Sequence, residues 1–239
     1  MKRDIKYTGE FERQICAPYW KPYFDDNTKI ESAMKKLTAN MNEEQINKVE
    51  VIIERISRIL NEQEVVLSEE EKEIIWDVKQ NFYSQIRLDD SGKYNCGKWY
   101  LSNANFEPSV FYYRCGIDLL EKPELILERD IIDAGAYIGD SSIVLSEYTN
   151  KKVYAFEALQ QNFLRIEETC KINNRNNIIP VNSALSAQEG VLTFYIREFG
   201  ETGHGLLKRD GVTYKKEEKV NVTTIDNYVN NNQLKVGLI

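Results

Sequence analysis

Residues 130–140, DIIDAGAYIGD, decide the fold of this chain. The two isoleucines form a short apolar run that predicts a buried strand, and a helical pattern follows over Ser141–Tyr148. Gly135 and Gly139 remove side chains between these elements, which allows the backbone to turn sharply and to approach a ligand closely. Asp133, at the end of the strand, is placed to order this loop or to reach a ligand through water. Such a turn is typical of the ligand-binding edge of an open α/β sheet.

Strands and helices alternate on the carboxyl side of this stretch. Apolar runs predict strands over Lys152–Phe156 and Ile178–Val181, and helical spacing over Leu159–Asn173 predicts the helix between them. This βαβαβ order implies a parallel sheet with right-handed crossovers. Two later segments, Gly190–Arg197 and Val220–Ile225, predict additional strands around a polar loop.

An acidic residue ends the second of these strands. Glu157 follows 24 residues after Asp133, at a place where a carboxylate accepts hydrogen bonds from both hydroxyls of a ribose. The glycine loop lacks the full Gly-x-Gly-x-x-Gly pattern of a pyrophosphate site, because Ala136 and Tyr137 stand where less bulk is required. A cofactor with a ribose but no phosphate tolerates this loop. The residues therefore favour S-adenosylmethionine over a nicotinamide dinucleotide.

The amino-terminal part of the chain has helical patterns without a catalytic signature. Residues 1–27 indicate an irregular, aromatic-rich arm, and Lys29–Leu37 a short helix. We expect Asn42 to cap a longer helix, and Ser68 with Glu71 to form the capping box of a third. The apolar faces of these two helices consist of Ile46, Val49, Ile53, Ile56 and Leu60, and of Ile74, Ile75, Val78, Phe82 and Ile86.

A turn at residues 89–92 and short strands over Lys98–Leu101 and Val110–Tyr113 are expected to lead into the parallel sheet. The sequence therefore predicts two parts. Residues 1–125 form a mainly helical region that serves as a lid, a substrate element or a dimerisation element. Residues 126–239 form the domain that binds the cofactor.

Composition is that of a soluble globular protein. The 239 residues are 42% hydrophobic and 29% charged, and the net charge of -7 counts against nonspecific nucleic-acid binding. The amino terminus has no apolar run of signal-peptide length, and no stretch approaches the roughly 18 apolar residues of a membrane span. We therefore expect a cytoplasmic protein without a transmembrane segment.

The cysteines and the single histidine do not form a metal-binding pattern. No two of the four cysteines have Cys-x-x-Cys spacing, and one histidine cannot complete a zinc site with them. We expect four reduced thiols and no metal.

Four blocks of the sequence resemble the FkbM family of S-adenosylmethionine-dependent methyltransferases. They read DIIDAGAYIGDSSIVLS, VYAFEALQQNFLRI, IIPVNSALSAQEGVLTF and VNVTTIDNYV, and together span about residues 130–229. Tyr137 replaces the asparagine, and Ala158 the proline, that are usual in the family. Both glycines and the acidic residue are kept, so the resemblance still implies cofactor binding.

The resemblance implies a Rossmann-like class I methyltransferase sheet in which Glu157 holds the ribose and residues 182–184 lie beside the adenine. It further implies O-methylation of a sugar or another small-molecule hydroxyl in polysaccharide or natural-product biosynthesis. Family members continue beyond a strand like the one that residues 236–239 begin. The sequence is therefore expected to be incomplete at its carboxyl end.

The predicted cofactor site draws on the ends of three strands. Its residues are Asp133, Gly135, Ala136, Tyr137, Gly139, Asp140, Glu157, Ala158, Asn162, Asn182, Ser183 and Ala184. His204 and Asp226 are the candidate general bases for a hydroxyl acceptor. An exposed loop histidine and an acid that caps the following helix are the alternative interpretations.

The expected partners are the cofactor, a small-molecule or saccharide acceptor and a second copy of the chain in a homodimer, without nucleic acid. Two other functions stay open. A noncatalytic module with the same fold would recruit a partner through its helical region, and failure to bind S-adenosylmethionine would favour it. A nucleic-acid methyltransferase would carry its characteristic motif beyond Ile239, but the acidic charge balance counts against it.

Overall fold

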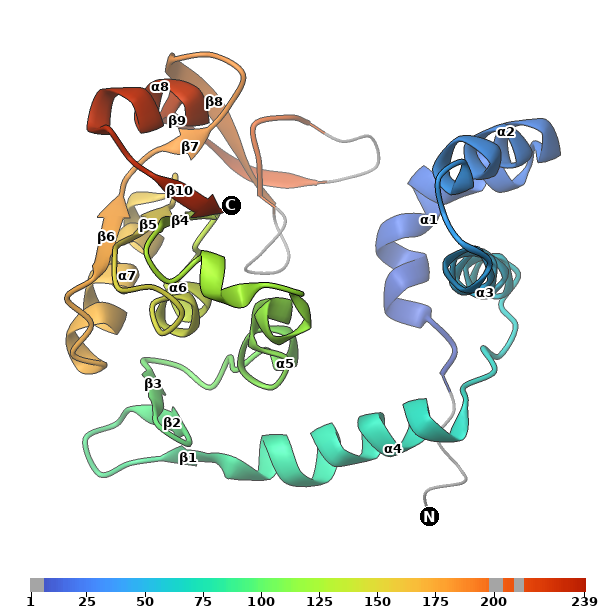
Figure 1. The fold of residues 1–239 in the computed structure, drawn as a ribbon, viewed down its shortest axis with the longest axis horizontal. Helices are drawn as coiled ribbons and strands as arrows, with labels where there is room; N and C mark the ends of the chain where they lie inside the picture. The colour runs from blue at the N-terminus through green and yellow to red at the C-terminus, as the bar shows by residue number, and fades with distance from the viewer. Residues whose placement is uncertain (1–6, 198–203, 209–212) are drawn as a thin grey trace. The chain divides into compact units, whose positions relative to one another are not determined.

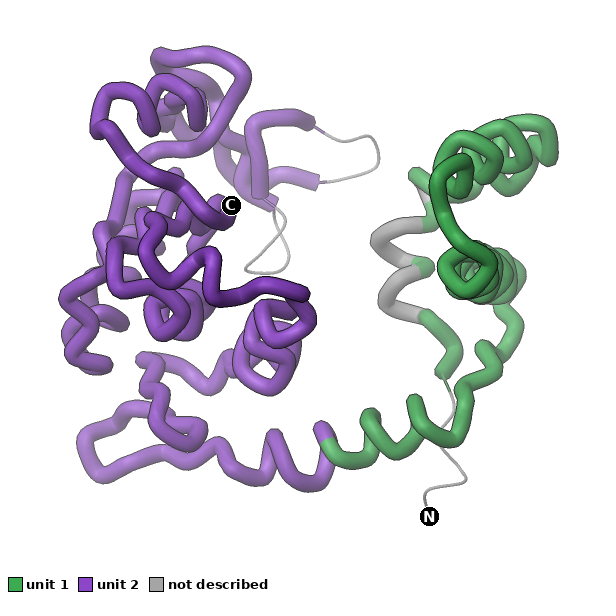
Figure 2. Tube along the Cα trace, in the orientation of Figure 1, with its two compact units in different colours: residues 1–77 green, residues 78–239 purple. Residues whose placement is uncertain are grey.

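The computed structural model describes residues 7–197, 204–208 and 213–239. It has helices at the amino-terminal end of the chain and a mixed α/β part that contains a four-stranded parallel sheet (Figure 1). The chain divides into two compact units, residues 1–77 and 78–239 (Figure 2). The sequence places a domain boundary after residue 125. Residues 78–125 belong to the same compact unit as the sheet.

The first unit consists of four helices: α1 (Glu10–Phe24), α2 (Asn27–Thr38), α3 (Glu43–Leu60) and α4 (Glu69–Asp77). The expectation of an irregular arm over residues 1–27 is wrong for α1. Its mean helix propensity is low because it contains Pro18 and Pro22 and several aromatic residues, but propensity is a weak guide when a helix packs against others. Helix α1 contacts both α2 and α3.

The predicted caps of α3 and α4 are confirmed. The Asn42 side chain accepts a hydrogen bond from the Gln45 N–H at 2.9 Å, and the Gln45 side chain accepts one from the Asn42 N–H. Ser68 and Glu71 make the same reciprocal pair at 3.1 and 2.7 Å. Glu71 also accepts two hydrogen bonds from the Arg55 guanidinium, which ties the start of α4 to α3.

The helix that begins at Ser68 ends earlier than its apolar spacing predicts. After α4 the chain makes a π-helical turn over Val78–Phe82 and a 3-10 turn over Tyr83–Gln85. Ile86, expected on the buried face of the helix, instead opens strand β1 (Ile86–Leu88). Over a short run, β-branched residues fit the 3.6-residue period of a helix as well as the two-residue period of a strand. The spacing alone therefore did not predict where the helix ends.

Strand β1 begins a small antiparallel sheet with β2 (Tyr94–Cys96) and β3 (Trp99–Leu101). The predicted turn is present, since Gly92 donates its N–H to the Asp89 carbonyl at 3.0 Å. The strand expected over Val110–Tyr113 is wrong. Pro108 starts the short helix α5 (Pro108–Phe111), because a proline at the first helical position has a backbone angle that suits a helix. Two 3-10 segments, η4 (Arg114–Leu119) and η5 (Pro123–Leu125), lead on to the parallel sheet.

The central sheet has four parallel strands in the order β10-β4-β5-β6. Their bounds are β4 Asp130–Ala134, β5 Val153–Phe156, β6 Ile178–Val181 and β10 Val236–Leu238. Helix α6 (Asp140–Leu145) connects β4 to β5, and α7 (Gln160–Ile172) connects β5 to β6. The βαβαβ order and the parallel pairing predicted from the sequence are confirmed.

Alternate residues of the strands pack against helices on opposite faces of the sheet. Val153 and Ala155 belong to the buried cluster that contains residues of α6 and α7. Tyr154 and Phe156 point the other way and contact the ring of Tyr228 in helix α8 (Ile225–Asn232), with ring centroids 5.7 and 4.8 Å apart. Covering both faces removes the apolar strands from water, as a parallel sheet requires.

A second small sheet and α8 lie between β6 and β10 in the chain. This sheet has the order β7-β9-β8, with β7 at Ala184–Leu185, β8 at Gly190–Arg197 and β9 at Tyr214–Thr223. Strand β8 has the predicted bounds. The strand expected over Val220–Ile225 begins earlier and ends at Thr223, since Thr224 caps α8 by accepting the Asn227 N–H at 3.1 Å.

Within the described ranges, no helix has the length and apolar character needed to cross a membrane.

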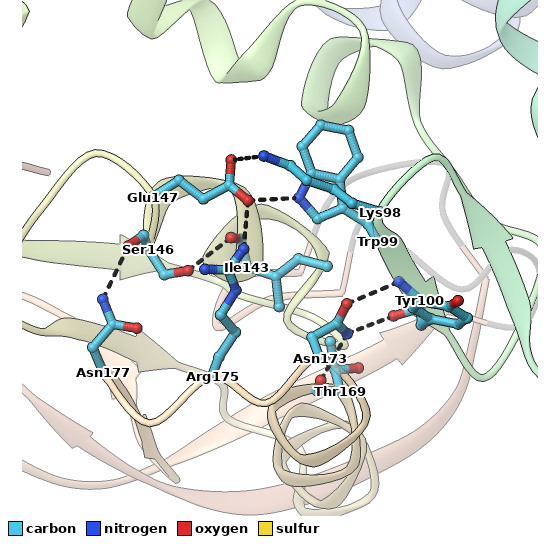
Figure 3. Close-up of polar contacts among 10 residues, drawn as sticks. All are labelled: Lys98, Trp99, Tyr100, Ile143, Ser146, Glu147, Thr169, Asn173, Arg175 and Asn177. Carbon is cyan, nitrogen blue, oxygen red and sulfur yellow. Dashed lines mark hydrogen bonds and ion pairs between the residues drawn. The ribbon is translucent and has the colours of Figure 1, made fainter.

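A largely buried carboxylate joins the antiparallel sheet to the parallel one. Glu147, just after α6, is 15% exposed and accepts hydrogen bonds from Lys98 Nζ at 2.7 Å and Trp99 Nε1 at 3.3 Å (Figure 3). It also pairs with the Arg175 guanidinium, from the turn between α7 and β6. These contacts fix β3 beside two loops at one end of the parallel sheet.

A neighbouring amide covers the outer edge of β3. Asn173 Oδ1 accepts the Tyr100 N–H at 2.8 Å, and Asn173 Nδ2 donates to the Tyr100 carbonyl at 2.7 Å (Figure 3). One side chain thus makes the two hydrogen bonds that a residue of an adjacent strand would make.

Replacement of Glu147 by glutamine is expected to lower the free energy of unfolding by about 2–4 kcal/mol, because two cations lose their partner and one of them is largely buried. Chemical denaturation measures the change. The matched control is Glu128→Gln, since the pair of Glu128 with Lys151 is 64% and 50% exposed and such a pair contributes at most about 1 kcal/mol. Equal effects of the two substitutions would contradict the structural role of Glu147.

Candidate functional site

The loops that follow β4, β5 and β6 meet at the carboxyl edge of the parallel sheet. Ala134 pairs with Phe156, and Phe156 with Val181, so these three strands end at the same level. The Glu157 N–H donates to the Val181 carbonyl at 3.0 Å and continues the pairing of β5 with β6 by one residue. The three predicted groups of site residues, from residues 133–140, 157–162 and 182–184, are therefore neighbours in space.

The glycine loop after β4 is held by its own backbone. Gly135 and Ala136 both donate their N–H groups to the Phe156 carbonyl, at 3.0 and 2.8 Å, and the Gly139 N–H donates to the Ala136 carbonyl at 2.6 Å. The Tyr137 N–H donates to Glu157 Oε2 at 3.1 Å. Four of the five amide groups in the loop therefore have partners inside the protein.

Three residues of this loop have left-handed backbone angles, with φ of 83° at Gly135, 50° at Tyr137 and 83° at Gly139. A Cβ atom at Gly139 would lie 3.2 Å from Ile166 Cγ2 of α7, so glycine allows α6 and α7 to approach each other. A Cβ atom at Gly135 would meet nothing within 4 Å. The left-handed angle at residue 137 is less common for tyrosine than for glycine or asparagine.

Glu157 connects the ends of β4 and β5. Its side chain accepts the Tyr137 N–H on one oxygen and the Leu159 N–H on the other, at 3.1 and 2.8 Å. It is 8% exposed. Burial raises the pKa of this carboxyl. Hydrogen bonds from the backbone of Leu159, Tyr137 and Ala158 and from the Asn162 side chain oppose the rise because they stabilise the charged form.

Asp133 orders the start of α6. Its Oδ2 accepts hydrogen bonds from the hydroxyls of Ser141 and Ser142, at 2.7 and 2.6 Å. The sequence predicts that Asp133 either orders the loop or reaches a ligand through water, and these contacts show its side chain bound to the first turn of α6. Burial raises the pKa of Asp133 in spite of the two hydroxyls.

A second buried acid, Asp140, lies close to Asp133. Burial, and after it the charges of Asp133 and Glu107, raise the pKa of Asp140 to about 6, against the hydrogen bonds of backbone amides. Burial and the same two aspartates raise the pKa of the Cys115 thiol to about 11. The Cys115 thiol is therefore protonated at neutral pH, as expected for an unreactive cysteine.

Residues 182–184 follow β6 and lie against the end of β5. Asn182 Nδ2 donates to the carbonyls of Glu157 and Ala158, at 3.0 and 3.2 Å. Ser183 is 8% exposed, and its hydroxyl donates to the Asn221 carbonyl of β9 at 3.1 Å. Ala184 begins β7. These residues thus join the end of the parallel sheet to the second small sheet.

A pocket of about 720 Å³ opens between the glycine loop, the start of α7 and strands β8 and β9. Its lining consists of Tyr137, Leu159, Gln160, Gln161, Asn162, Leu164, Arg165, Ile196, His204, Lys215, Lys216 and Glu218. Three residues that the sequence predicts for the site, Tyr137, Asn162 and His204, thus share one cavity.

His204 has a defined proton position in this pocket. Its Nδ1 accepts the Arg197 N–H at 3.1 Å, so the neutral ring carries its proton on Nε2. Burial, and after it the charges of Lys215 and Arg197, lower the pKa of His204. The ring is therefore neutral at pH 7, with a hydrogen-bond donor at Nε2. It would have to give up the Arg197 contact to accept a proton on Nδ1.

Asp226 does not line this pocket. It is exposed in the first turn of α8, and Thr224 rather than Asp226 caps that helix. The two candidate bases therefore do not lie in one cavity.

Sequence reasoning missed three basic residues of the pocket, Arg165, Lys215 and Lys216. Arg165 lies three residues after Asn162 on the same helix, so helical spacing alone places the two side chains on one face. Nothing in the sequence brings Lys215 to α7, because its position depends on how β8 and β9 pair. In the described part of the chain, no three histidine, cysteine, aspartate or glutamate residues form a group that could hold a metal ion.

No model of a known protein family matches the chain, and no curated protein is significantly similar to it in sequence. The resemblance to the FkbM family rests on the four sequence blocks.

The raised pKa of Asp140 predicts how stability depends on pH. A carboxyl with a pKa of 3.8 in the unfolded chain and about 6 in the folded one stabilises the fold below pH 3.8, and this contribution is lost as the pH rises through 6. Between pH 4 and 7 the free energy of unfolding should fall by about 2 kcal/mol more in the parent chain than in Asp140→Asn. Urea denaturation at the two pH values measures this difference, and parallel changes in both chains would exclude a buried, proton-binding Asp140.

Proposed function

We propose that this chain binds S-adenosylmethionine at the carboxyl edge of its parallel sheet and transfers the methyl group to a hydroxyl of a sugar or another small molecule. One observation carries the proposal. A buried carboxylate at the end of β5, Glu157, holds the glycine loop that follows β4. The class of acceptor comes from the resemblance to the FkbM family.

The strand order supports a Rossmann-like class I methyltransferase sheet. Counted along the chain, β4, β5, β6 and β10 are the first to fourth strands, and they lie in the order 3-2-1-4. This is the beginning of the 3-2-1-4-5-6 order of doubly wound sheets. Such sheets bind ligands outside the carboxyl ends of the strands, where the order reverses. Here this place is the edge between β4 and β10, beside the glycine loop.

The amide groups of the loop favour a cofactor without phosphate. A dinucleotide site presents backbone N–H groups to a pyrophosphate. In this chain the N–H groups of Gly135, Ala136 and Tyr137 are already bound to Phe156 and Glu157. A pyrophosphate would have to break these hydrogen bonds, whereas S-adenosylmethionine has no group that requires them.

Glu157 is placed to bind a ribose together with its protein donors. Its oxygens accept the Tyr137 and Leu159 N–H groups, and the Ala158 backbone and the Asn162 side chain also stabilise its charge, so ribose hydroxyls would share the carboxylate with these groups. The same carboxylate can thus keep the loop in place and bind the cofactor. Asn182 donates to the carbonyls of residues 157 and 158, so the loop after β6 is fixed beside this position, where the resemblance implies the adenine.

Methyl transfer breaks the bond between the methyl carbon and the sulfonium sulfur and forms a bond from that carbon to the acceptor oxygen. The electron pair of the broken bond stays on sulfur as S-adenosylhomocysteine, and the hydroxyl proton passes to solvent water. The protein chiefly has to align oxygen, carbon and sulfur. His204 lines the pocket as a donor, so we assign it to binding the acceptor rather than to taking its proton.

Calorimetric titration of the chain with S-adenosylmethionine tests the proposal. The informative variant is Glu157→Gln, which retains one acceptor oxygen but loses the charge. We expect the parent to bind and Glu157→Gln to bind at least about tenfold more weakly, because a charged acceptor makes hydrogen bonds roughly twice as strong as a neutral one. Glu157→Ala is less suitable, because it leaves the Tyr137 and Leu159 N–H groups without a partner and lowers stability.

Two controls accompany the titration. Glu128→Gln should bind as the parent does, and the melting temperatures of all variants show that the loss concerns the ligand rather than the fold. Titration with NADH tests the dinucleotide interpretation. Binding of NADH in place of S-adenosylmethionine would refute the proposal, and so would equal binding by parent and Glu157→Gln. Absence of all binding would favour a noncatalytic module.

A further inference from the structure

The pocket between α7 and the β8–β9 pair has an excess of positive charge. Among the described residues, four of the lining side chains are charged: Arg165 on α7, and Lys215, Lys216 and Glu218 on β9. Lys216 Nζ and Glu218 Oε1 pair with each other at 2.5 Å. In the part of the chain that the structure describes, Arg165 and Lys215 have no ion pair with an acidic side chain.

The excess is local to this pocket. The whole chain has a net charge of -7, so two cations that have no acidic partner among the described residues do not follow from its average composition. The pKa of His204 is lowered by burial and then by the positive charges of Lys215 and Arg197. An anion placed in the pocket would be attracted by the positive charges of Arg165, Lys215 and Arg197.

The geometry of His204 adds a neutral donor to the same cavity. Because Nδ1 accepts the Arg197 N–H, the proton of the neutral ring is on Nε2. The remaining polar lining from α7 consists of the amides of Gln160, Gln161 and Asn162. Around the two cations, the pocket therefore offers groups that donate hydrogen bonds, and its one acid is paired with Lys216.

We propose that this pocket receives a carboxylate or phosphate group of the methyl acceptor, with Arg165 and Lys215 as its ion-pair partners and His204 as a hydrogen-bond donor. The acceptor is then an anionic small molecule, such as an acidic or phosphorylated sugar. This inference rests on the proposed function, because the cavity is next to the glycine loop through Tyr137. A neutral sugar would leave both cations without a partner and would bind more weakly.

Saturation-transfer NMR titrations without cofactor test the charge preference. The probes are glucuronate, glucose 1-phosphate and, as the neutral control, glucose. We expect at least one of the two anions to bind about tenfold or more tightly than glucose, and the preference to weaken with added salt. The stronger of the two anions identifies carboxylate or phosphate as the recognised group.

Neutralising variants then assign the preference to the pocket. Arg165→Gln and Lys215→Gln should each reduce anion binding about tenfold and leave the binding of glucose unchanged. Lys171→Gln is the matched control, since Lys171 is an exposed cation on the same helix and does not line the pocket. Circular dichroism of each variant confirms that α7 is intact.

The outcomes separate this inference from the proposed function. Equal binding of glucose and both anions, or variants that bind anions as the parent does, would overturn it.

Calorimetry with S-adenosylmethionine should give the same affinity for Arg165→Gln, Lys215→Gln and the parent. A loss there would mean that the cations hold the cofactor, which also overturns it. An intact anion preference in a chain that does not bind S-adenosylmethionine would refute the methyltransferase proposal alone, and the pocket would remain an anion site.

Discussion

The arrangement of the candidate site depends on one carboxylate that accepts two backbone N–H groups. Glu157 links the loop after β4, through Tyr137, to the first turn of α7, through Leu159. Both segments contribute to the pocket, so the position of this side chain determines how the loop and the helix face each other. Burial without these hydrogen bonds would favour the neutral acid. The same interaction thus keeps the site ordered and preserves the charge that a ribose would require.

Whereas Glu157 keeps the site ordered, the buried acids Asp133, in β4, and Asp140, at the start of α6, lower the stability of the fold when they are charged. Asp133 has two serine hydroxyls as partners, whereas Asp140 is close to other negative groups and gains less from its amides. Two buried aspartates with raised pKa values make the folded state less stable as they ionise. A buried site that lowers stability in this way is common where binding requires groups that packing alone would not select.

The sequence predicts the parallel sheet well because its strands are buried on both faces and its glycines have a definite structural need. Gly139 is required by its left-handed backbone, which is local to one strand–turn–helix unit, and by the approach of Ile166 from α7 in the next unit. The predictions for α1 and for Val110–Tyr113 are wrong because tertiary packing and Pro108 decide those segments. Of the candidate site, residues on the strand ends could be predicted from spacing. Lys215 could not be predicted, since no local sequence pattern indicates how β8 pairs with β9.

Strand β3 is an edge strand, and an unpaired edge can recruit a strand from another molecule. The side-chain amide of Asn173 occupies the outward N–H and carbonyl of Tyr100 at the middle of this short strand. A foreign strand would have to displace that amide before it could form continuous pairing. Asn173 therefore protects the folded chain against self-association through this edge, independently of any ligand that the molecule binds.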